Sequence, residues 1–241
     1  MPTLEETLKR LAVTFTVKDI MISQAALVTA VGESEAAEIS RQHPDFTVIP
    51  IRTNGKLNGY FERDSGVTRA IRLDDLISDG TSLLDIVEIF ETRQFSFVLS
   101  HQQIAGYIHF SDLNHHLVKL TFYVILQALE RRALSLIQVE ETDAKEYLRA
   151  SLDRRRFDSI CGQYERDGDS ARCFFNYLNI SDVLKLAVSA GKIQMATEVI
   201  NASKEIRNGA AHPSENIVAN YESVKKLGIV GRACLRILAN I

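Results

Sequence analysis

The feature that most constrains this chain is an internal repeat with a spacing of 47 residues. Gly59-Tyr60 and Gly106-Tyr107 occupy matching places, each in a short apolar run that follows a turn. A helical pattern, a β-branched run and a returning run recur around both dipeptides. Because a repeated unit of this size rarely buries its apolar face alone, the two copies are expected to pack against each other.

The first copy predicts strands at residues 26–31 and 46–51, with a helix at residues 33–40 between them. Asn54-Gly55 is a strong hairpin signal because both residues accept the positive φ of a type I′ turn. The run at residues 57–61 is then the returning strand of that hairpin.

The second copy predicts a helix at residues 83–90, for which Thr81 or Ser82 is the N-cap. Strands at residues 95–99 and 104–108 follow, and Asp112 begins another helix. Both copies therefore share the order helix, strand, strand.

The rest of the chain is helical in pattern. Apolar periodicity predicts helices at residues 116–138, 145–164, 182–190 and 195–211, and a final helix that reaches residue 241. Ser181 is the expected cap of the third helix, and Gly191 its expected end. Pro213 ends the fourth helix. Four or five helices with short connections predict an all-α bundle.

Charge divides the chain at the same place. Residues 1–117 hold 10 Lys+Arg against 16 Asp+Glu, and residues 118–241 hold 18 against 15. We expect two domains with different partners. They are a tandem pair at 1–117, with repeats at about 13–70 and 71–117, and a bundle at 118–241.

Composition excludes several classes of protein. No apolar run approaches the roughly 18 residues of a membrane-spanning helix, and the N-terminus carries acids where a secretory signal would carry bases. The 3 cysteines lack metal-binding spacing, which favours a reducing, cytoplasmic location. A net charge of −3 excludes binding of nucleic acid through bulk positive charge.

Residues 13–117 resemble a pair of CBS domains. The likeness is carried by Val17-Lys-Asp-Ile-Met21 and by Gly106-Tyr-Ile-His-Phe-Ser-Asp112. It implies an adenine nucleotide in the cleft between the modules, with Asp112 accepting hydrogen bonds from the ribose hydroxyls. His109 stands where the family usually has Ser or Thr, and Ser65 occupies the place of the Asp in the first repeat.

Asp112 also has a simpler interpretation, as the cap of a helix over residues 113–130. The alternatives of ribose ligand and helix cap stay open at this point. Asp112 and His116 are spaced four residues apart, but the helix-start role already accounts for the Asp, so no metal site is predicted.

Residues 118–241 resemble a HEPN domain. The signature is Arg207-Asn208-(Gly-Ala-Ala)-His212, followed by Pro213 at a helix end late in the bundle. The resemblance implies a metal-independent endoribonuclease that acts as a homodimer and leaves a 2′,3′-cyclic phosphate.

The three side chains of this signature suit that reaction. The imidazole of His212 would accept the 2′-hydroxyl proton or donate one to the leaving oxygen. The Arg207 guanidinium stabilises charge on the phosphate, and Asn208 orients one of these groups. Arg207 and His212 point about 140° apart on an ideal helix, so a dimer would bring both types together. The small residues 209–211 would permit close helix approach there.

A structural interpretation remains beside the catalytic one. Arg207 would then cap carbonyl groups at the helix end, and His212 would interact with the helix dipole. Likewise, Arg154-Arg155-Arg156 either contacts phosphate or forms a solvated helix face.

Together these observations predict an α+β chain with CBS-like β-α-β-β-α modules followed by a four- or five-helix bundle. The leading hypothesis is a cytoplasmic endoribonuclease, acting on RNA in stress response or defence. An adenine nucleotide would regulate it, and catalysis would need no cofactor. The alternative is a non-catalytic nucleotide-sensing dimer whose bundle binds RNA or a partner protein.

Overall fold

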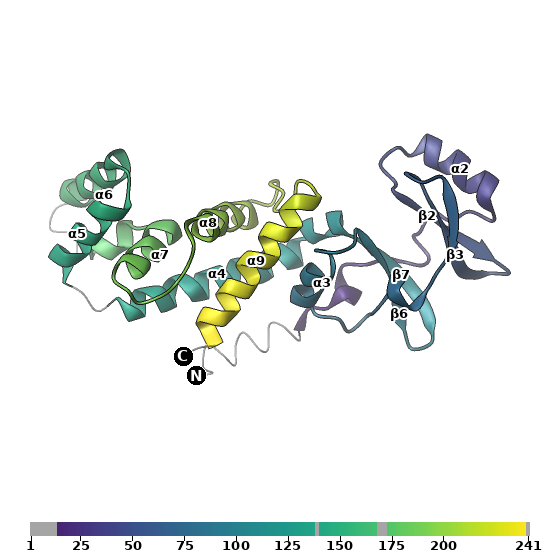
Figure 1. Cartoon of the computed structure of the whole chain (residues 1–241), viewed down its shortest axis with the longest axis horizontal. Coiled ribbons are helices and arrows are strands. Elements are labelled where there is room, and N and C mark those ends of the chain that lie inside the picture. The colour runs from purple at the N-terminus through teal and green to yellow at the C-terminus, as the bar shows by residue number, and fades with distance from the viewer. Residues whose placement is uncertain (1–13, 138–139, 168–172, 240–241) are drawn as a thin grey trace. The chain divides into compact units, whose positions relative to one another are not determined.

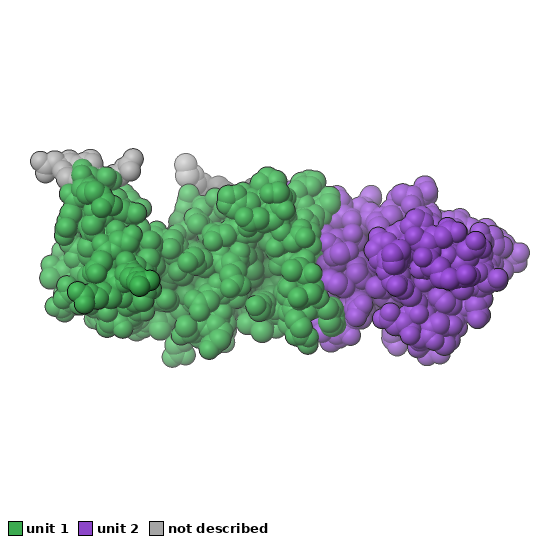
Figure 2. Space-filling view, turned by 90° about the horizontal axis from the view of Figure 1, so that it is seen from above, with its two compact units in different colours: residues 1–14, 113–241 green, residues 15–112 purple. Residues whose placement is uncertain are grey.

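The computed structural model describes residues 14–137, 140–167 and 173–239, and these divide into two compact units (Figures 1 and 2). Unit 2 comprises Phe15–Asp112, and unit 1 comprises the chain from Leu113 onward with Thr14. Unit 2 holds the sheets and unit 1 is helical. The expected mixture of α and β structure is confirmed.

Unit 2 contains two antiparallel hairpins, each with added strands. One sheet has the order β2 (Val48–Thr53), β3 (Lys56–Glu62), β4 (Val67–Ala70). The other has the order β1 (Ile22–Ser23), β7 (Gln103–His109), β6 (Phe95–Ser100), β5 (Leu76–Ser78). The helices of this unit are α2 (Glu33–Gln42) and α3 (Leu83–Ile89), with the short 3₁₀ turns η1 (Val17–Asp19) and η2 (Leu73–Asp75).

The two hairpins repeat each other in detail. Asn54 and Gly55 have φ values of 52° and 77°, which confirms the type I′ turn between β2 and β3. The β2–β3 register shifts after Ile51, and the β6–β7 register shifts after Val98, 47 positions later. Such bulges re-aim the strand, so both copies bend at the same place.

Each repeat lends its first strand to the sheet of the other. β1 pairs with β7 through Ile22↔Tyr107, and β4 pairs with β3 through Arg69↔Tyr60, the same pairing moved by 47 residues. By this spacing, β4 is the first strand of the second repeat. The exchange ties the two modules together through main-chain hydrogen bonds as well as side-chain packing.

A glycine makes each exchange sterically feasible. A Cβ atom at Gly106 would lie 2.5 Å from the Ile22 carbonyl oxygen, and one at Gly59 would lie 2.9 Å from the Arg69 carbonyl oxygen. Both distances are shorter than a carbon–oxygen contact tolerates, so the lent strand approaches only because these two positions lack a side chain.

Aromatic side chains fill the space between the two sheets. Tyr60 and Tyr107 are buried in one cluster with Phe97. Phe95 packs edge-on against Tyr60 at a centroid distance of 5.3 Å and stacks on Tyr107 at 5.9 Å. Burial of such large rings supplies much of the apolar area that stabilises the pair of modules.

The strand predicted at residues 26–31 is wrong. This stretch makes a turn and contributes a single parallel bridge, Ala30↔Ile51, while the strand β1 lies earlier. The bridge is the counterpart of the Ile77↔Val98 pair between β5 and β6. Residues 26–28 instead line a cavity that is described below.

Unit 1 is built around one long helix. Its described elements are the turn η3 (Phe110–Asn114), which begins in unit 2, and then α4 (His116–Leu136), α5 (Glu141–Ser151), α6 (Arg154–Asp167), η4 (Phe174–Tyr177), α7 (Ile180–Ser189), α8 (Thr197–Ala211) and α9 (Tyr221–Ala239). Helices α7, α8 and α9 all pack on α4, and α5 packs on α7 (Figure 1). The core is the buried face of α4, which includes Phe122, Ile125 and Leu129.

Two helical predictions need correction. The stretch at 145–164 is two helices rather than one, because the backbone turns to an extended conformation at Leu152. The cap of α7 is Asn179, whose side chain accepts the Asp182 N–H at 3.1 Å, and not Ser181, which is buried. Gly191 follows α7 with φ 67°, as expected for a glycine past a helix end. The described part of unit 1 has six α-helices.

Replacing Gly106 by Ala tests the strand exchange. We expect Gly106→Ala to lower the free energy of unfolding by about 1–3 kcal/mol, because its methyl group would overlap the Ile22 carbonyl. Gly80→Ala is the matched control, since a Cβ there meets only the Ser78 hydroxyl at 3.6 Å. Urea denaturation measures both, and an equal effect of the two variants would contradict the account.

Candidate functional site

A cavity of about 220 Å³ opens within unit 2, where the two repeats meet. It is formed by the segment after β1, by the start of β2, and by the end of β7 with the turn that follows. Its apolar wall has seven members: Ile22, Ala26, Leu27, Val28, Phe46, Val48 and Pro50. An enclosed apolar wall of this kind is typical of a small-molecule site.

The remaining residues that line the cavity carry polar groups. They are Asp45, Thr47, Tyr107, His109, Ser111 and Asp112. Two residues predicted as ligand-binding, His109 and Asp112, are therefore brought together at one cavity. The segment from β7 to η3 positions both of them.

Asp112 does not cap a long helix. Its Oδ2 atom accepts the backbone N–H of His109 at 2.8 Å, which closes the turn after β7. The N-cap of α4 is His115, whose Nδ1 atom accepts the Leu117 N–H at 3.3 Å. Burial raises the pKa of the Asp112 carboxyl above its ordinary value, and the His109 N–H acts in the opposite direction. The capping interpretation of Asp112 is thus wrong.

His109 presents a neutral ring at this cavity. Its Nδ1 atom lies 2.9 Å from the Ser111 hydroxyl and accepts the Ser111 backbone N–H at 3.3 Å, so the proton of the neutral ring resides on Nε2. The ring also packs on Phe110 at a centroid distance of 4.3 Å. Burial lowers the pKa of His109 to about 4, which leaves the imidazole uncharged at neutral pH.

Tyr107 also lines the cavity. It is 8% exposed, and its phenol interacts with the Thr47 hydroxyl. Burial raises the pKa of Tyr107. The ring therefore offers an uncharged hydroxyl and a flat apolar face.

Ser65, the third predicted ligand residue, lies elsewhere. It follows β3, and its hydroxyl donates to the Glu62 carboxylate at 2.7 Å. It does not line the cavity that holds His109 and Asp112.

In unit 1, Arg207 lies on α8 and faces α4. Its Nη2 atom is 3.3 Å from the Glu130 carboxylate, and the two side chains are 26% and 14% exposed. Burial raises the pKa of Glu130, while Arg207 opposes that rise. The predicted contact of Arg207 with helix-end carbonyls is not what the structure contains, since the guanidinium pairs with a carboxylate.

His212 and Asn208 are exposed at the end of the same helix. The His212 backbone N–H donates to the Asn208 carbonyl at 3.2 Å, and His212 itself is already extended, with φ −108° and ψ 115°. Asn208 and His212 thus share one turn, whereas Arg207 reaches Glu130. Within this chain, the structure does not bring Arg207 and His212 into a hydrogen bond.

The segment after His212 is anchored from α4. The buried Lys119 donates to the carbonyl groups of Pro213, at 2.9 Å, and Glu215. The Asn114 amide exchanges two hydrogen bonds with the Val218 backbone, at 2.7 and 2.9 Å. These contacts fix the backbone on which the exposed imidazole is carried.

Gly209 lies where the segment after His212 packs against α8. A Cβ atom there would lie 3.1 Å from the Ile217 side chain, so Gly209 allows the segment to pack back onto α8. In this chain the buried glycine is covered by its own loop, which accounts for it without a helix from a second copy.

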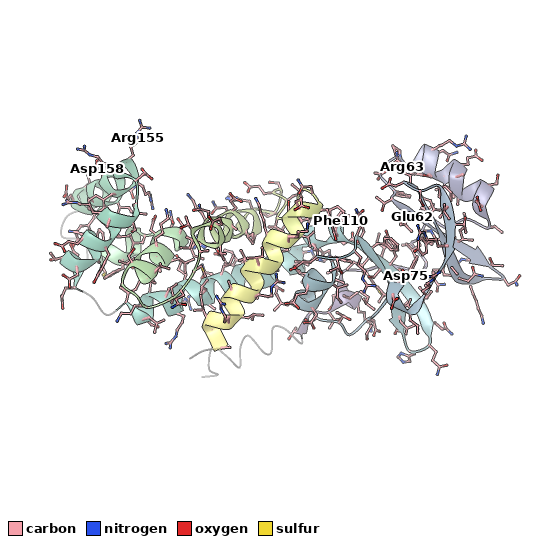
Figure 3. The ribbon with its side chains drawn as sticks, viewed as in Figure 1. Glu62, Arg63, Asp75, Phe110, Arg155 and Asp158 are labelled. Atoms are coloured by element: carbon pink, nitrogen blue, oxygen red, sulfur yellow. The ribbon has the colours of Figure 1, made fainter. Side chains whose placement is uncertain are left out.

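Two of the three basic residues at the start of α6 form ion pairs within the chain. The Arg156 guanidinium pairs at 2.5 Å with Asp182, a carboxylate that is 2% exposed. Arg154 lies 3.6 Å from Asp158. Arg155 and Asp158, labelled in Figure 3, project from the surface of the helix. The solvated-face interpretation therefore describes Arg154 and Arg155, whereas the half-buried Arg156 pairs with the buried Asp182.

Within residues 14–137, 140–167 and 173–239, no group of three or more His, Cys, Asp or Glu side chains is placed to hold a metal ion. No helix in the described part of the chain combines the length and apolarity needed to cross a bilayer.

Sequence reasoning missed Asp45, Phe46, Thr47 and Tyr107 as cavity residues. The strand predicted at residues 46–51 hides Phe46 and Thr47, because in the structure β2 begins at Val48 and these two residues line the cavity. The repeat in the sequence could have indicated these residues, because pairing of the two copies brings the start of β2 and the end of β7 to the same cavity.

The sequence matches no protein-family model and no curated protein. Two solved structures resemble part of the chain, both of the CBS domain of a bacterial CNNM/CorC family Mg²⁺ transporter. One, in complex with ATP, has 11% identity and a TM-score of 0.37, covering 46% of this chain and 92% of that one. The other, in complex with the inhibitor IGN95a, has 13% identity and a TM-score of 0.36, covering 49% and 86%. At such scores, the CBS-like description of unit 2 rests on its own repeat and strand order.

The neutral state of His109 predicts a pH dependence of stability. Its folded pKa of about 4 lies below the ordinary 6.5, so protonation favours the unfolded chain. The uncharged His109 ring therefore makes its full contribution to the free energy of unfolding above about pH 6.5. This contribution is lost as the pH falls toward 4. The raised pKa of Asp112 acts in the opposite sense at the acid end.

Comparison with a variant isolates the His109 effect. Chemical denaturation of wild type and His109→Gln from pH 7.5 to 4.5 should give a steeper loss of unfolding free energy for wild type. Parallel curves for the two proteins would contradict the buried, neutral imidazole.

Proposed function

We propose that unit 2 is a sensor that binds the adenosine part of an adenine nucleotide or a related compound in the cavity between its repeats. The observation that carries this proposal is the Asp112 carboxylate, held by the His109 N–H in a cavity that is also lined by seven apolar residues. A carboxylate in such a place accepts hydrogen bonds from the vicinal hydroxyls of a ribose.

The apolar residues of the cavity provide a surface on which the base of the nucleotide can pack. Phe46, Pro50 and Val28 offer flat or branched apolar surface, and Tyr107 adds an aromatic face. A purine ring buries its two faces well between such groups. The resemblance to CBS domains supplies adenine as the base.

The position of the cavity in the chain supports a regulatory role. Asp112 is in η3, and α4 of unit 1 begins four residues later, at His116. A ligand that binds two arrangements of this turn with different affinity shifts the balance between them. The same turn leads directly into the helix on which α7, α8 and α9 pack.

Replacing the carboxylate tests the binding proposal. In calorimetric titrations with adenosine, AMP and ATP, at least one should bind with one molecule per chain. Asp112→Asn should weaken that binding about tenfold or more, because a hydrogen bond to a charged group contributes about 1.5–3 kcal/mol. Asp64→Asn, at an exposed position outside the cavity, is the control. Absence of binding by all three compounds, or equal binding by Asp112→Asn, would contradict the proposal.

A second candidate function is the metal-independent cleavage of RNA by Arg207, Asn208 and His212 in a homodimer. The exposed His212 on an anchored backbone favours it, since a catalytic imidazole must be both accessible and held in place. Arg207 keeps further N–H donors beside the one that pairs with Glu130, and these can fork onto a phosphate.

The proposed reaction needs no external reagent. The ribose 2′ oxygen attacks phosphorus and loses its proton to His212, while the bond from phosphorus to the 5′ oxygen breaks. The leaving oxygen takes up a proton from a second imidazole or from water. The products are a 2′,3′-cyclic phosphate and a 5′-hydroxyl end. The Arg207 guanidinium offsets the charge that develops on the phosphate oxygens.

A cleavage assay in excess chelator tests this second function. Wild type should cleave RNA, and His212→Ala should be at least about a hundredfold slower, the contribution expected of general acid–base catalysis. His101→Asn is the control, because His101 is an exposed histidine on the β6–β7 turn, with a φ of 56° that Asn accepts. Cleavage by His212→Ala would refute the assignment. RNA binding without cleavage by wild type would support a non-catalytic bundle instead.

A further inference from the structure

The two repeats give unit 2 two equivalent positions, and one of them is the cavity lined by His109 and Asp112. Each cavity residue has a counterpart in the other repeat, 47 positions later or earlier in the sequence. Six counterparts carry charge, namely Glu62, Asp64, Arg69, Asp74, Asp75 and Arg93. They replace His109, Ser111, Ile22, Leu27, Val28 and Phe46 of the cavity, in that order.

At the counterpart position several of these residues interact with one another. Arg69 pairs with Glu62 at 2.9 Å, and the Ser65 hydroxyl donates to the same carboxylate at 2.7 Å. The Arg93 guanidinium donates to the Asp74 backbone carbonyl. Glu62 and Asp75 are labelled in Figure 3. The Glu62 carboxylate, the counterpart of His109, is thus already engaged by Arg69 and Ser65.

The open cavity differs from this position in having no basic side chain. Asp45 and Asp112 both line it, His109 is uncharged, and none of the described residues that line it is Lys or Arg. Arg69 and Arg93, the two arginines that align with cavity residues, both stand at the counterpart position instead. The lining of the cavity is therefore acidic at neutral pH.

An acidic lining disfavours a phosphate group. A nucleoside monophosphate carries close to two negative charges at neutral pH, and protein sites for phosphate normally supply Arg, Lys or a helix N-terminus. Two carboxylates near a phosphate would repel it, most strongly where water is excluded. The cavity volume of about 220 Å³ is also below the roughly 300–1,000 Å³ of common ligand sites.

We infer that the cavity selects a nucleoside whose 5′ carbon carries an uncharged or positively charged group, and discriminates against nucleoside phosphates. The inference rests on the proposed function of unit 2, and it specifies the chemical class of ligand. The ribose diol contacts Asp112, the base lies on the apolar wall, and Asp45 faces the rest of the ligand.

Three compounds that differ only at the 5′ position test this selectivity. They are 5′-amino-5′-deoxyadenosine, adenosine and AMP, titrated calorimetrically into the full chain at low and at moderate salt. The amine should bind at least as tightly as adenosine, and AMP should bind about tenfold more weakly or worse. Added salt should reduce the difference in affinity between the amine and AMP, because it screens the charge of the carboxylates.

Replacing Asp45 by Asn separates the effect of its charge on affinity from the effect of the shape of the cavity. Asp45→Asn should raise the ratio of AMP affinity to adenosine affinity at least about threefold, and it should lower the ratio of amine affinity to adenosine affinity. Asp64→Asn, outside the cavity, should change neither ratio.

The outcomes distinguish the inference from the proposed function. Tighter binding of AMP than of adenosine in wild type, with loss in Asp112→Asn, would overturn the selectivity while the sensor role stands. Affinity ratios that do not respond to Asp45→Asn would also overturn it. Failure of all three compounds to bind would overturn the sensor role and the selectivity together.

Discussion

The architecture of unit 2 depends on the close approach of a lent strand to the glycine of the other repeat. At Gly106 and at Gly59 the neighbouring carbonyl oxygen occupies space that a Cβ atom would need. This contact lets each repeat complete the sheet of its copy, so neither module is a closed unit by itself. The exchange also brings the end of β7 opposite the start of β2, and the cavity lies between these two segments. The candidate ligand site is thus a consequence of the strand exchange.

Once the exchange is in place, the two equivalent positions are free to diverge. One has acquired arginines and carboxylates that pair with each other, as in Arg69 with Glu62. The other has kept apolar residues at the same places and a carboxylate, Asp112, among its polar residues. Ion pairs between exposed side chains contribute little stability, so the paired position is explained better as loss of a site than as a gain in folding energy. We propose one ligand for each chain on this basis.

Local signals in the sequence predicted much of the fold, because they act over a few residues. Asn54-Gly55 fixed a hairpin through its backbone preference, and the matching Gly-Tyr pairs located both copies of the repeat. Features that depend on distant contacts were missed. Residues 26–28 were expected in a strand, yet they line a cavity, and β4 and β5 acquire strand structure from partners elsewhere in the chain. The sequence left Asp112 open between a ribose ligand and a helix cap, and in the structure His115 caps α4 while Asp112 closes a turn. Of the candidate site, the sequence supplied His109 and Asp112, and the other cavity residues required the fold.

The account of unit 2 makes one central claim, that adenosine occupies the cavity between the repeats. Methyl NMR of protein labelled at Ile, Leu and Val tests it directly, because Ile22, Leu27, Val28 and Val48 line this cavity. With saturating adenosine, the account predicts nuclear Overhauser effects from base and ribose protons to methyl groups of these residues. Contacts only to methyl groups elsewhere in the chain, with these four unaffected, would contradict it.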